Sequence, residues 1–409
     1  MDSKVLEKYA RLLVKTGVNI QKNQILVIQS PIEAAAFARI VSEIAFKEGA
    51  KDVQILWKDE LSTKIKYSYG PDEIFEEYPS WQKEFYISYA RKGAAFLNIY
   101  ATDPELLKDI NPERVAKYQK VTNIALKEYR DRTMTNQNAW CIASIPTVAW
   151  AKKVFPDLSE DDAVKSLWKA ILKSVRVDQE DPVAAWEEHK KSLEKRIDFL
   201  NSKKFRYLHY KNELGTDLVI ELPKNHLWTG GADFTQDGTA FIANMPTEEV
   251  FTLPKKDGVN GKVVSSMPLN YNGSLIDEFS LTFKDGKIID FTAKEGYDNL
   301  KHLINTDEGS AYLGEVALVP YDSPISNLKT LFYNTLFDEN ASCHLAIGKA
   351  YSPCIKGGEK MTDEELKKEG ANDSLVHEDF MIGTKDLEIM GTSFDGEEIA
   401  IFKDGNFAF

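Results

Sequence analysis

The first half of the chain alternates between helical and strand-like spacing of its apolar residues. Apolar side chains recur every three or four positions over residues 3–16, which predicts a helix. Short apolar runs predict strands at 25–28, 53–57, 94–100 and 139–145, with helical spacing between them. A strand–helix–strand unit of this kind places its two strands parallel. The pattern therefore predicts an open, mainly parallel α/β sheet with flanking helices.

Ser30 and Pro31 stand between the first predicted strand and the helix that follows it. Ser is a favoured N-cap and Pro a favoured first helical residue, so we expect this helix to begin here and to end near Gly49. A helix start attracts anions. The surrounding residues match neither the dinucleotide fingerprint nor the phosphate-binding loop, so a capped helix explains them better than a nucleotide site does.

The pattern changes near Phe205, where long helical segments give way to short strands and turns. Residues 159–200 are strongly helical, whereas the chain beyond them is rich in alternating apolar and polar positions. Two strand-like runs flank each of three turns, which predicts hairpins around 213–216, 285–286 and 395–396. We therefore expect an α/β N-terminal domain over 1–200 and a β-rich α+β C-terminal domain over 201–409.

The amino-acid composition limits which binding partners and which cellular location we expect for the protein. Of 409 residues, 43% are hydrophobic and 28% are charged, which is typical of a folded globular protein. The formal net charge of −13 disfavours nucleic acid, whose phosphates are bound by clustered Lys and Arg. No apolar run approaches the roughly 18 residues of a membrane-spanning helix, and no secretion signal is visible. The three cysteines suggest no disulfide framework. We expect a cytoplasmic protein with no membrane or nucleic-acid partner.

His377 and Asp379 are the strongest candidates for chemistry. They precede an apolar run that predicts a strand entering a core. Residues two apart on a strand share a face, so this imidazole and carboxylate can face one object while Glu378 points away. Such a pair suits zinc, cobalt or manganese. A hydrogen bond that closes the end of a strand is the alternative, and the pair alone does not exclude it.

Two acidic residues upstream strengthen the metal hypothesis. Glu249 and Glu315 each lie beside or within an apolar, β-rich run, where a carboxylate is costly to bury unless it is paired or bound to a metal. The pattern does not decide between Glu248 and Glu249, because neighbours in an extended segment face opposite sides. With His344 and Tyr351, these segments supply enough carboxylates, imidazoles and a phenol for two metal ions.

Four sequence motifs carry a resemblance to a known family. They are Asn-Met-Pro-Thr-Glu-Glu-Val-Phe-Thr from 244, Gly-Glu-Val-Ala-Leu-Val from 314, His-Leu-Ala-Ile-Gly-Lys-Ala-Tyr from 344 and His-Glu-Asp-Phe-Met-Ile-Gly-Thr from 377. In their order and spacing, the motifs resemble those of the M29 aminopeptidases, the thermophilic metallopeptidases that include aminopeptidases T and S. The likeness covers essentially the full length. The His-Glu-x-x-His motif of other zinc peptidases is absent.

The resemblance implies a metal-dependent aminopeptidase that releases N-terminal amino acids from short peptides. It implies a metal-activated water at a dinuclear site with two divalent ions (zinc, cobalt or manganese), a catalytic C-terminal domain and a homodimer. Glu249, Glu315 and Tyr351 match the catalytic positions of the family. The metal ligands that it implies are Glu249, Glu315, His344, Tyr351, His377 and Asp379.

Several alternatives stay open on the sequence alone. Tyr351 could bind a metal, donate a hydrogen bond to the reacting oxyanion, or only pack against its neighbours. A glutamate of the site is the expected proton acceptor, since no separate base is evident. Rival functions are hydrolysis of another amide, as by a dipeptidase, and metal binding without catalysis. Residues that we expect to be structural or solvated are Asp233, Asp237, His226, His302 and His189.

Overall fold

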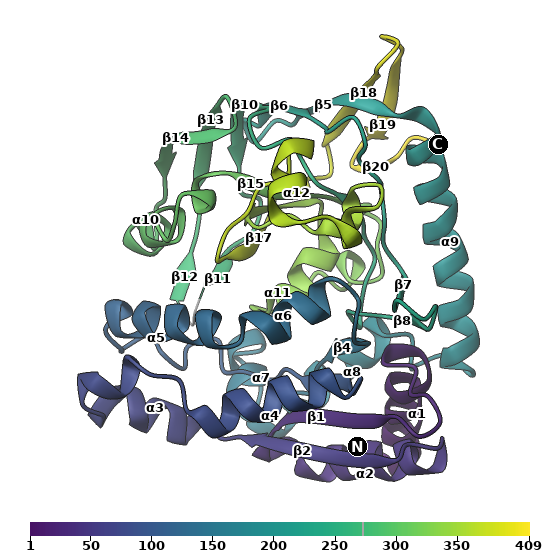
Figure 1. The fold of residues 1–409 in the computed structure, drawn as a ribbon, viewed down its shortest axis with the longest axis vertical. Helices are drawn as coiled ribbons and strands as arrows, with labels where there is room; N and C mark the ends of the chain where they lie inside the picture. Colours follow the sequence, from purple (N-terminus) through teal and green to yellow (C-terminus); the bar gives the residue numbers. More distant parts are fainter. Residues whose placement is uncertain (272–273) are drawn as a thin grey trace. The chain divides into compact units, whose positions relative to one another are not determined.

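The computed structural model describes residues 1–271 and 274–409. The chain forms two compact units, one of Met1–Lys190 with Ala232–Thr247 and the other of Lys191–Gly231 with Glu248–Phe409. Figure 1 shows the path of the chain through its helices and strands. The described chain contains no helix that combines the length and the apolar character needed to cross a bilayer. The domain boundary that we expect between residues 200 and 201 stays a prediction.

The first unit is built on a four-stranded parallel sheet in the order β2-β1-β3-β4, which confirms the predicted α/β architecture. Its strands are β1 (Ile25–Pro31), β2 (Asp52–Lys58), β3 (Ala95–Ile99) and β4 (Trp140–Ala143), with a small hairpin of β7 (Asp233–Phe234) and β8 (Ala240–Phe241). Its helices are α1 (Ser3–Leu12), α2 (Ala35–Lys47), α3 (Glu60–Tyr69), α4 (Ser80–Arg91), α5 (Pro112–Ala125), α6 (Lys127–Met134), α7 (Val148–Val154) and α8 (Glu160–Ser174). A π-helical turn at Leu13–Gly17 and 3-10 turns at Ile32–Ala34 and Asp72–Phe75 complete the unit.

Helices bury both faces of this sheet, as parallel sheets require. On one face, Val27 of β1 and Phe96 of β3 join a cluster with Tyr86 of α4. Tyr9 of α1 stacks on Phe37 of α2 with their ring centroids 5.3 Å apart. Apolar residues thus lie on the inner faces of amphipathic helices, in agreement with the spacing seen in the sequence.

The expected helix start at Ser30 and Pro31 is wrong. Both residues belong to β1, which continues its parallel pairing as far as Pro31 opposite Lys58. The Ser30 hydroxyl donates to the Pro31 carbonyl at 3.0 Å instead of capping a helix. A 3-10 turn then begins at Ile32, and α2 begins only at Ala35. The fully buried position of Ser30 within the strand outweighs its local preference for a cap.

Helix α9 (Pro182–Lys203) leads into the second unit, whose described residues form two large antiparallel sheets and the two-stranded pair β11-β12. The larger sheet has eight strands in the order β14-β13-β10-β6-β5-β18-β19-β20, and its hairpins confirm the three predicted from the turns. These strands are β5 (Phe205–Lys211), β6 (Asp217–Glu221), β10 (Val259–Val264), β13 (Ser280–Lys284), β14 (Lys287–Thr292), β18 (Glu388–Ser393), β19 (Glu398–Lys403) and β20 (Asn406–Phe407). The unit also contains β11 (Leu269–Tyr271), β12 (Ser274–Ile276), α10 (Tyr297–Ile304), α11 (Thr335–Asp338) and α12 (Asp363–Glu369). Its 3-10 turns lie at Gly309–Ala311, Ser326–Leu328, Glu339–Ala341, Ser352–Cys354 and Gly358–Lys360.

The smaller sheet of this unit has four strands in the order β17-β16-β15-β9 and carries the candidate chemistry. The strands are β9 (Val250–Thr252), β15 (Leu313–Leu318), β16 (His344–Gly348) and β17 (His377–Met381). One face contributes Val316, Leu345 and Phe380 to a hydrophobic core that also includes residues of the larger sheet. Because side chains alternate along a strand, the neighbouring positions on β15, β16 and β17 point to the opposite face.

Candidate metal centre

The face of the small sheet that lies opposite the core gathers four of the predicted ligands. Glu315 pairs with Ala346 on the next strand, and Ala346 pairs with Asp379 on the strand beyond it. His344 and His377 are the first residues of β16 and β17. Glu249 directly precedes β9, whose Val250 pairs with Leu318. Ala346 lies between the two carboxylates in this row and adds only a methyl group there.

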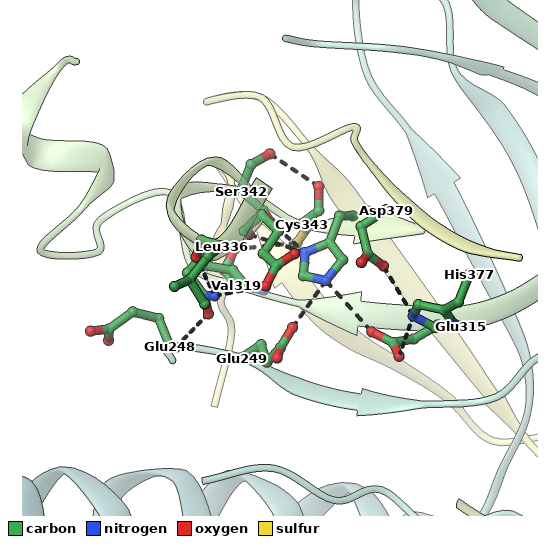
Figure 2. A network of polar contacts seen from close by, with 12 residues as sticks. Glu248, Glu249, Glu315, Val319, Leu336, Ser342, Cys343, His377 and Asp379 are labelled. Atoms are coloured by element: carbon green, nitrogen blue, oxygen red, sulfur yellow. Dashed lines mark hydrogen bonds and ion pairs between the residues drawn. The ribbon is translucent and has the colours of Figure 1, made fainter. Parts of the chain in front are cut away.

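Glu315 occupies the middle of the cluster, with each of its oxygens facing a different imidazole (Figure 2). Oε1 lies 3.6 Å from Nε2 of His344, and Oε2 lies 3.6 Å from Nε2 of His377. On the outer sides, Glu249 Oε2 is 2.9 Å from His344 Nε2, and Asp379 Oδ1 is 3.5 Å from His377 Nε2. The cluster therefore consists of two groups of ligand atoms that share one carboxylate.

Backbone carbonyls fix the orientation of both imidazoles. His344 Nδ1 lies 3.0 Å from the carbonyl oxygen of Glu339, and His377 Nδ1 lies 2.7 Å from that of Lys349. A carbonyl only accepts hydrogen bonds, so Nδ1 carries the proton of each neutral ring and donates it. Each Nε2 therefore presents a lone pair to the carboxylates, which is how most histidines that bind metals are held.

The cluster has an electrostatic imbalance that a divalent cation would remove. Burial, reinforced by the negative charge of Asp379, raises the pKa of Glu315 to about 7. Burial acts to lower the pKa of His377, but Asp379 and Glu315 outweigh it and raise this pKa to about 10. Burial also acts to lower the pKa of His344. The facing carboxylates of Glu249 and Glu315 outweigh burial and hold this pKa well above 6.5. Carboxylates and imidazoles that would otherwise have to share protons are suited to sharing metal ions instead.

The distances also fit a metal. Bonds from zinc to His nitrogen and carboxylate oxygen are about 2 Å long, so two ligand atoms on one ion lie roughly 3 Å apart. Without an ion or an extra proton, the lone pairs of Glu249 Oε2 and His344 Nε2 would face each other across 2.9 Å. The residues present thus fit a metal ion that prefers nitrogen and oxygen ligands.

The two groups differ in access to solvent. The side chains of His344 and Glu249 are 1% and 8% exposed, whereas those of His377 and Asp379 are 18% and 16% exposed. The second group is therefore the one that a substrate or a solvent molecule reaches more readily.

Glu248 and Glu249 take different roles, which the sequence pattern left undecided. Figure 2 shows the side chain of Glu248 directed away from the imidazoles that Glu249 faces. Burial lowers the pKa of Arg196, and the nearby negative charge of Glu248 opposes that effect. The geometry thus places Glu249, rather than Glu248, in the cluster.

Tyr351 lies beside the more exposed group. Its ring is 4.7 Å from that of His377, in an edge-to-face arrangement, and 6.0 Å from that of Phe251. Burial, followed by the charges of Glu315 and Asp379, raises the pKa of Tyr351 well above 10. At neutral pH the phenol therefore keeps its proton and can act as a hydrogen-bond donor.

Glu339 is a buried acid of this site that sequence reasoning missed. It follows α11 and is 7% exposed. Burial raises its pKa strongly, and the negative charges of Asp379 and Glu249 add to that effect. The available signal was the acidic pair Asp338-Glu339 next to an apolar segment and only five residues before His344. Four carboxylates thus surround the two imidazoles.

The remaining polar residues named from the sequence lie elsewhere. His226 Nδ1 bonds the Pro223 carbonyl, His302 is exposed on α10, and Asp233 accepts from Asn136. Asp237 accepts hydrogen bonds from Thr235 and Thr239. His189 is half-buried rather than fully solvated, and its ring lies 3.1 Å from Arg176 and 2.8 Å from the Thr247 carbonyl oxygen. None of these five residues belongs to the cluster of ligand atoms.

Comparisons with known proteins agree on one family. The profile of the family described as "Thermophilic metalloprotease (M29)" matches residues 2–407. Aminopeptidase 2 of Geobacillus stearothermophilus is 51% identical over 406 residues, covering 99% of this chain and 98% of that protein. Aminopeptidase AmpS of Bacillus subtilis (strain 168) is 49% identical over 407 residues, covering 100% of this chain and 99% of that protein. The solved structure of wild-type AmpT from Thermus thermophilus superposes with a TM-score of 0.92 at 37% identity, covering 99% of both chains.

Proposed function

Because the chain belongs to the M29 family of thermophilic metalloproteases and is a metal-dependent aminopeptidase, we propose that it releases N-terminal amino acids from short peptides at a dinuclear centre. The observation that carries the dinuclear proposal is the position of Glu315, whose two oxygens face two separate imidazoles. A carboxylate shared in this way is the usual means of holding two ions a few ångströms apart.

In this proposal, Glu249, Glu315 and His344 would hold one ion, and Glu315, His377 and Asp379 would hold the other. Oxygen and imidazole ligands suit zinc, cobalt and manganese. Two such ions would polarise the scissile carbonyl and lower the pKa of the attacking water. Glu339 places a fourth carboxylate beside these residues, and this added negative charge favours two divalent cations over one.

The protein's own groups orient and complete this centre. The carbonyls of Glu339 and Lys349 hold the two imidazoles with Nε2 directed inward. The neutral phenol of Tyr351, beside the more exposed group, donates a hydrogen bond to the oxyanion that develops on the substrate. Proton transfer from the water falls to a glutamate of the centre, because its histidines have no free proton-accepting nitrogen once Nε2 binds an ion. Glu249, Glu315 and Tyr351 are the catalytic residues in this assignment.

The expected substrate class, peptides with a free N-terminus, rests on the family to which the chain belongs and on the aminopeptidases that it resembles. The assignment to short peptides and the homodimeric state rest on the family resemblance, and the cytoplasmic location rests on the composition of the sequence.

Hydrolysis of aminoacyl and N-acetylated aminoacyl fluorogenic substrates tests the proposal. The purified protein is assayed as isolated, after chelation, and after addition of zinc, cobalt or manganese. We expect activity on free amines only, its loss on chelation and its return with metal. Glu249→Gln and Glu315→Gln should abolish turnover, whereas Glu308→Gln, a matched change at a side chain that is 90% exposed, should not. Cleavage of acetylated substrates, or activity that survives full metal removal, would contradict the proposal.

A further inference from the structure

Asn340 has a completely buried side-chain amide, which contacts Glu339 beside the candidate metal centre. Its side chain is 0% exposed and makes no contact with the imidazoles. We propose that Asn340 is a positioning residue, which holds the carboxylate of Glu339 and the backbone leading into Glu249 in the geometry that binds metal. The inference rests on the proposed ligand set.

Three hydrogen bonds define this role. Oδ1 of Asn340 accepts from the backbone N–H of Glu248 at 2.8 Å, one residue before Glu249. Nδ2 donates to the Leu336 carbonyl at 2.9 Å and to Oε1 of Glu339 at 3.3 Å. One side chain therefore joins the segment that carries Glu249 to the segment that carries Glu339. Glu249 and Glu339 are 90 residues apart in the sequence and approach the cluster from different elements.

Only an amide of this length fits both contacts. The Glu248 N–H requires an acceptor, whereas the Leu336 carbonyl and the Glu339 carboxylate require donors. An aspartate of the same shape would keep the acceptor but lose both donors, and it would place a second negative charge against Glu339. The Glu339 carboxylate would then move away from residue 340 or hold a proton, and either change alters the negative charge that faces the proposed ligands.

Metal binding by the Asn340→Asp variant tests the proposal. Metal-free protein is titrated with zinc against a chromophoric chelator, and unfolding is followed with and without zinc. Loss of a hydrogen bond among the residues that surround a set of metal ligands typically weakens metal affinity about 10–100-fold. We expect a change of this size for at least one ion and a correspondingly smaller zinc-induced rise in Tm. A residue that only stabilises the fold would lower the Tm of the metal-free protein and leave the zinc-induced rise unchanged.

The matched control is Asn201→Asp. Asn201 accepts a hydrogen bond from the N–H of Trp228 at 2.8 Å and donates one to the Trp228 carbonyl at 2.9 Å, so its amide also bonds through both its oxygen and its nitrogen, but to none of the acids of the centre. Asn201→Asp should leave zinc affinity unchanged. If Asn340→Asp does not fold, Asn340→Ser, which keeps a shorter donor and acceptor, provides the same comparison. Zinc affinity within twofold of wild type in the folded Asn340 variant would overturn the positioning role, and failure of the wild type to bind zinc would instead overturn the proposed function.

Discussion

Replacing Glu315 by Gln should change stability in opposite directions with and without metal. Burial raises the pKa of Glu315 from 4.5 to about 7 in the metal-free protein. Each pKa unit corresponds to about 1.4 kcal/mol, so ionised Glu315 lowers the free energy of unfolding by about 3 kcal/mol at pH 8. Because the folded-state pKa is raised, this penalty is absent below about pH 4.5 and complete above about pH 7.

The variant removes this penalty but introduces a buried amide. An amide N–H that lacks an acceptor costs about 1–3 kcal/mol, so metal-free Glu315→Gln should gain only about 1 kcal/mol at pH 8. Zinc reverses the order, because a ligand at 1,000 times its dissociation constant stabilises the folded state by about 4 kcal/mol per site. Wild type should gain this stabilisation, whereas the variant has lost the carboxylate that both groups of ligands share.

Chemical denaturation at pH 5 and pH 8, with chelator and with zinc, gives the difference in free energy of unfolding between variant and wild type in four conditions. We expect the variant to be more stable than wild type in only one of them, at pH 8 with chelator. A metal-free variant that is less stable than wild type at pH 8 would refute the assignment of Glu315 as a strained, buried carboxylate. Equal stabilisation of both proteins by zinc would refute its role as a shared ligand.

Three further predictions concern the phenol, the space above the sheet and the response to acid. Tyr351→Phe should lower kcat by about 100-fold, the usual effect of losing one oxyanion donor, with bound zinc unchanged by elemental analysis. Loss of zinc from this variant would instead make the phenol a ligand. Ala346→Val should fill the space between Glu315 and Asp379 and reduce bound zinc, while circular dichroism remains that of wild type. Burial lowers the pKa of His226, so folding stability should fall as pH drops below about 6.5, and His226→Gln should flatten this part of a denaturation–pH curve. An identical curve for the variant would rule out His226 as the source.

The parts of the fold that could be predicted from the sequence are those that local pattern determines. The two-residue turn Asp285-Gly286 joins β13 to β14 as expected, since these residues accept the left-handed conformation that such turns need. The alternation of His377 and Asp379 with apolar Phe380 correctly predicted a shared face for the two polar residues. The prediction of a helix start at Ser30 was wrong because the preference of Ser for a cap is local, and the pairing of β1 with β2 outweighed it.

The site itself depended on contacts that no local pattern reveals. Glu248 and Glu249 have nearly the same sequence surroundings, and only the position of His344 on a distant strand separates their roles. Glu339 was missed because it lies in a short buried turn rather than in a strand with recognisable alternation. The family resemblance supplied the candidate ligands, and the structure brings the ligand atoms of five of them together.

The central claim is that two ions share Glu315. A crystal structure of the zinc-loaded protein, with anomalous differences collected at the zinc absorption edge, tests this claim most directly. We expect two anomalous peaks about 3.5–4 Å apart, one on each side of the Glu315 carboxylate, with His344 beside one and His377 beside the other. A single peak, or two peaks of which only one contacts Glu315, would contradict it.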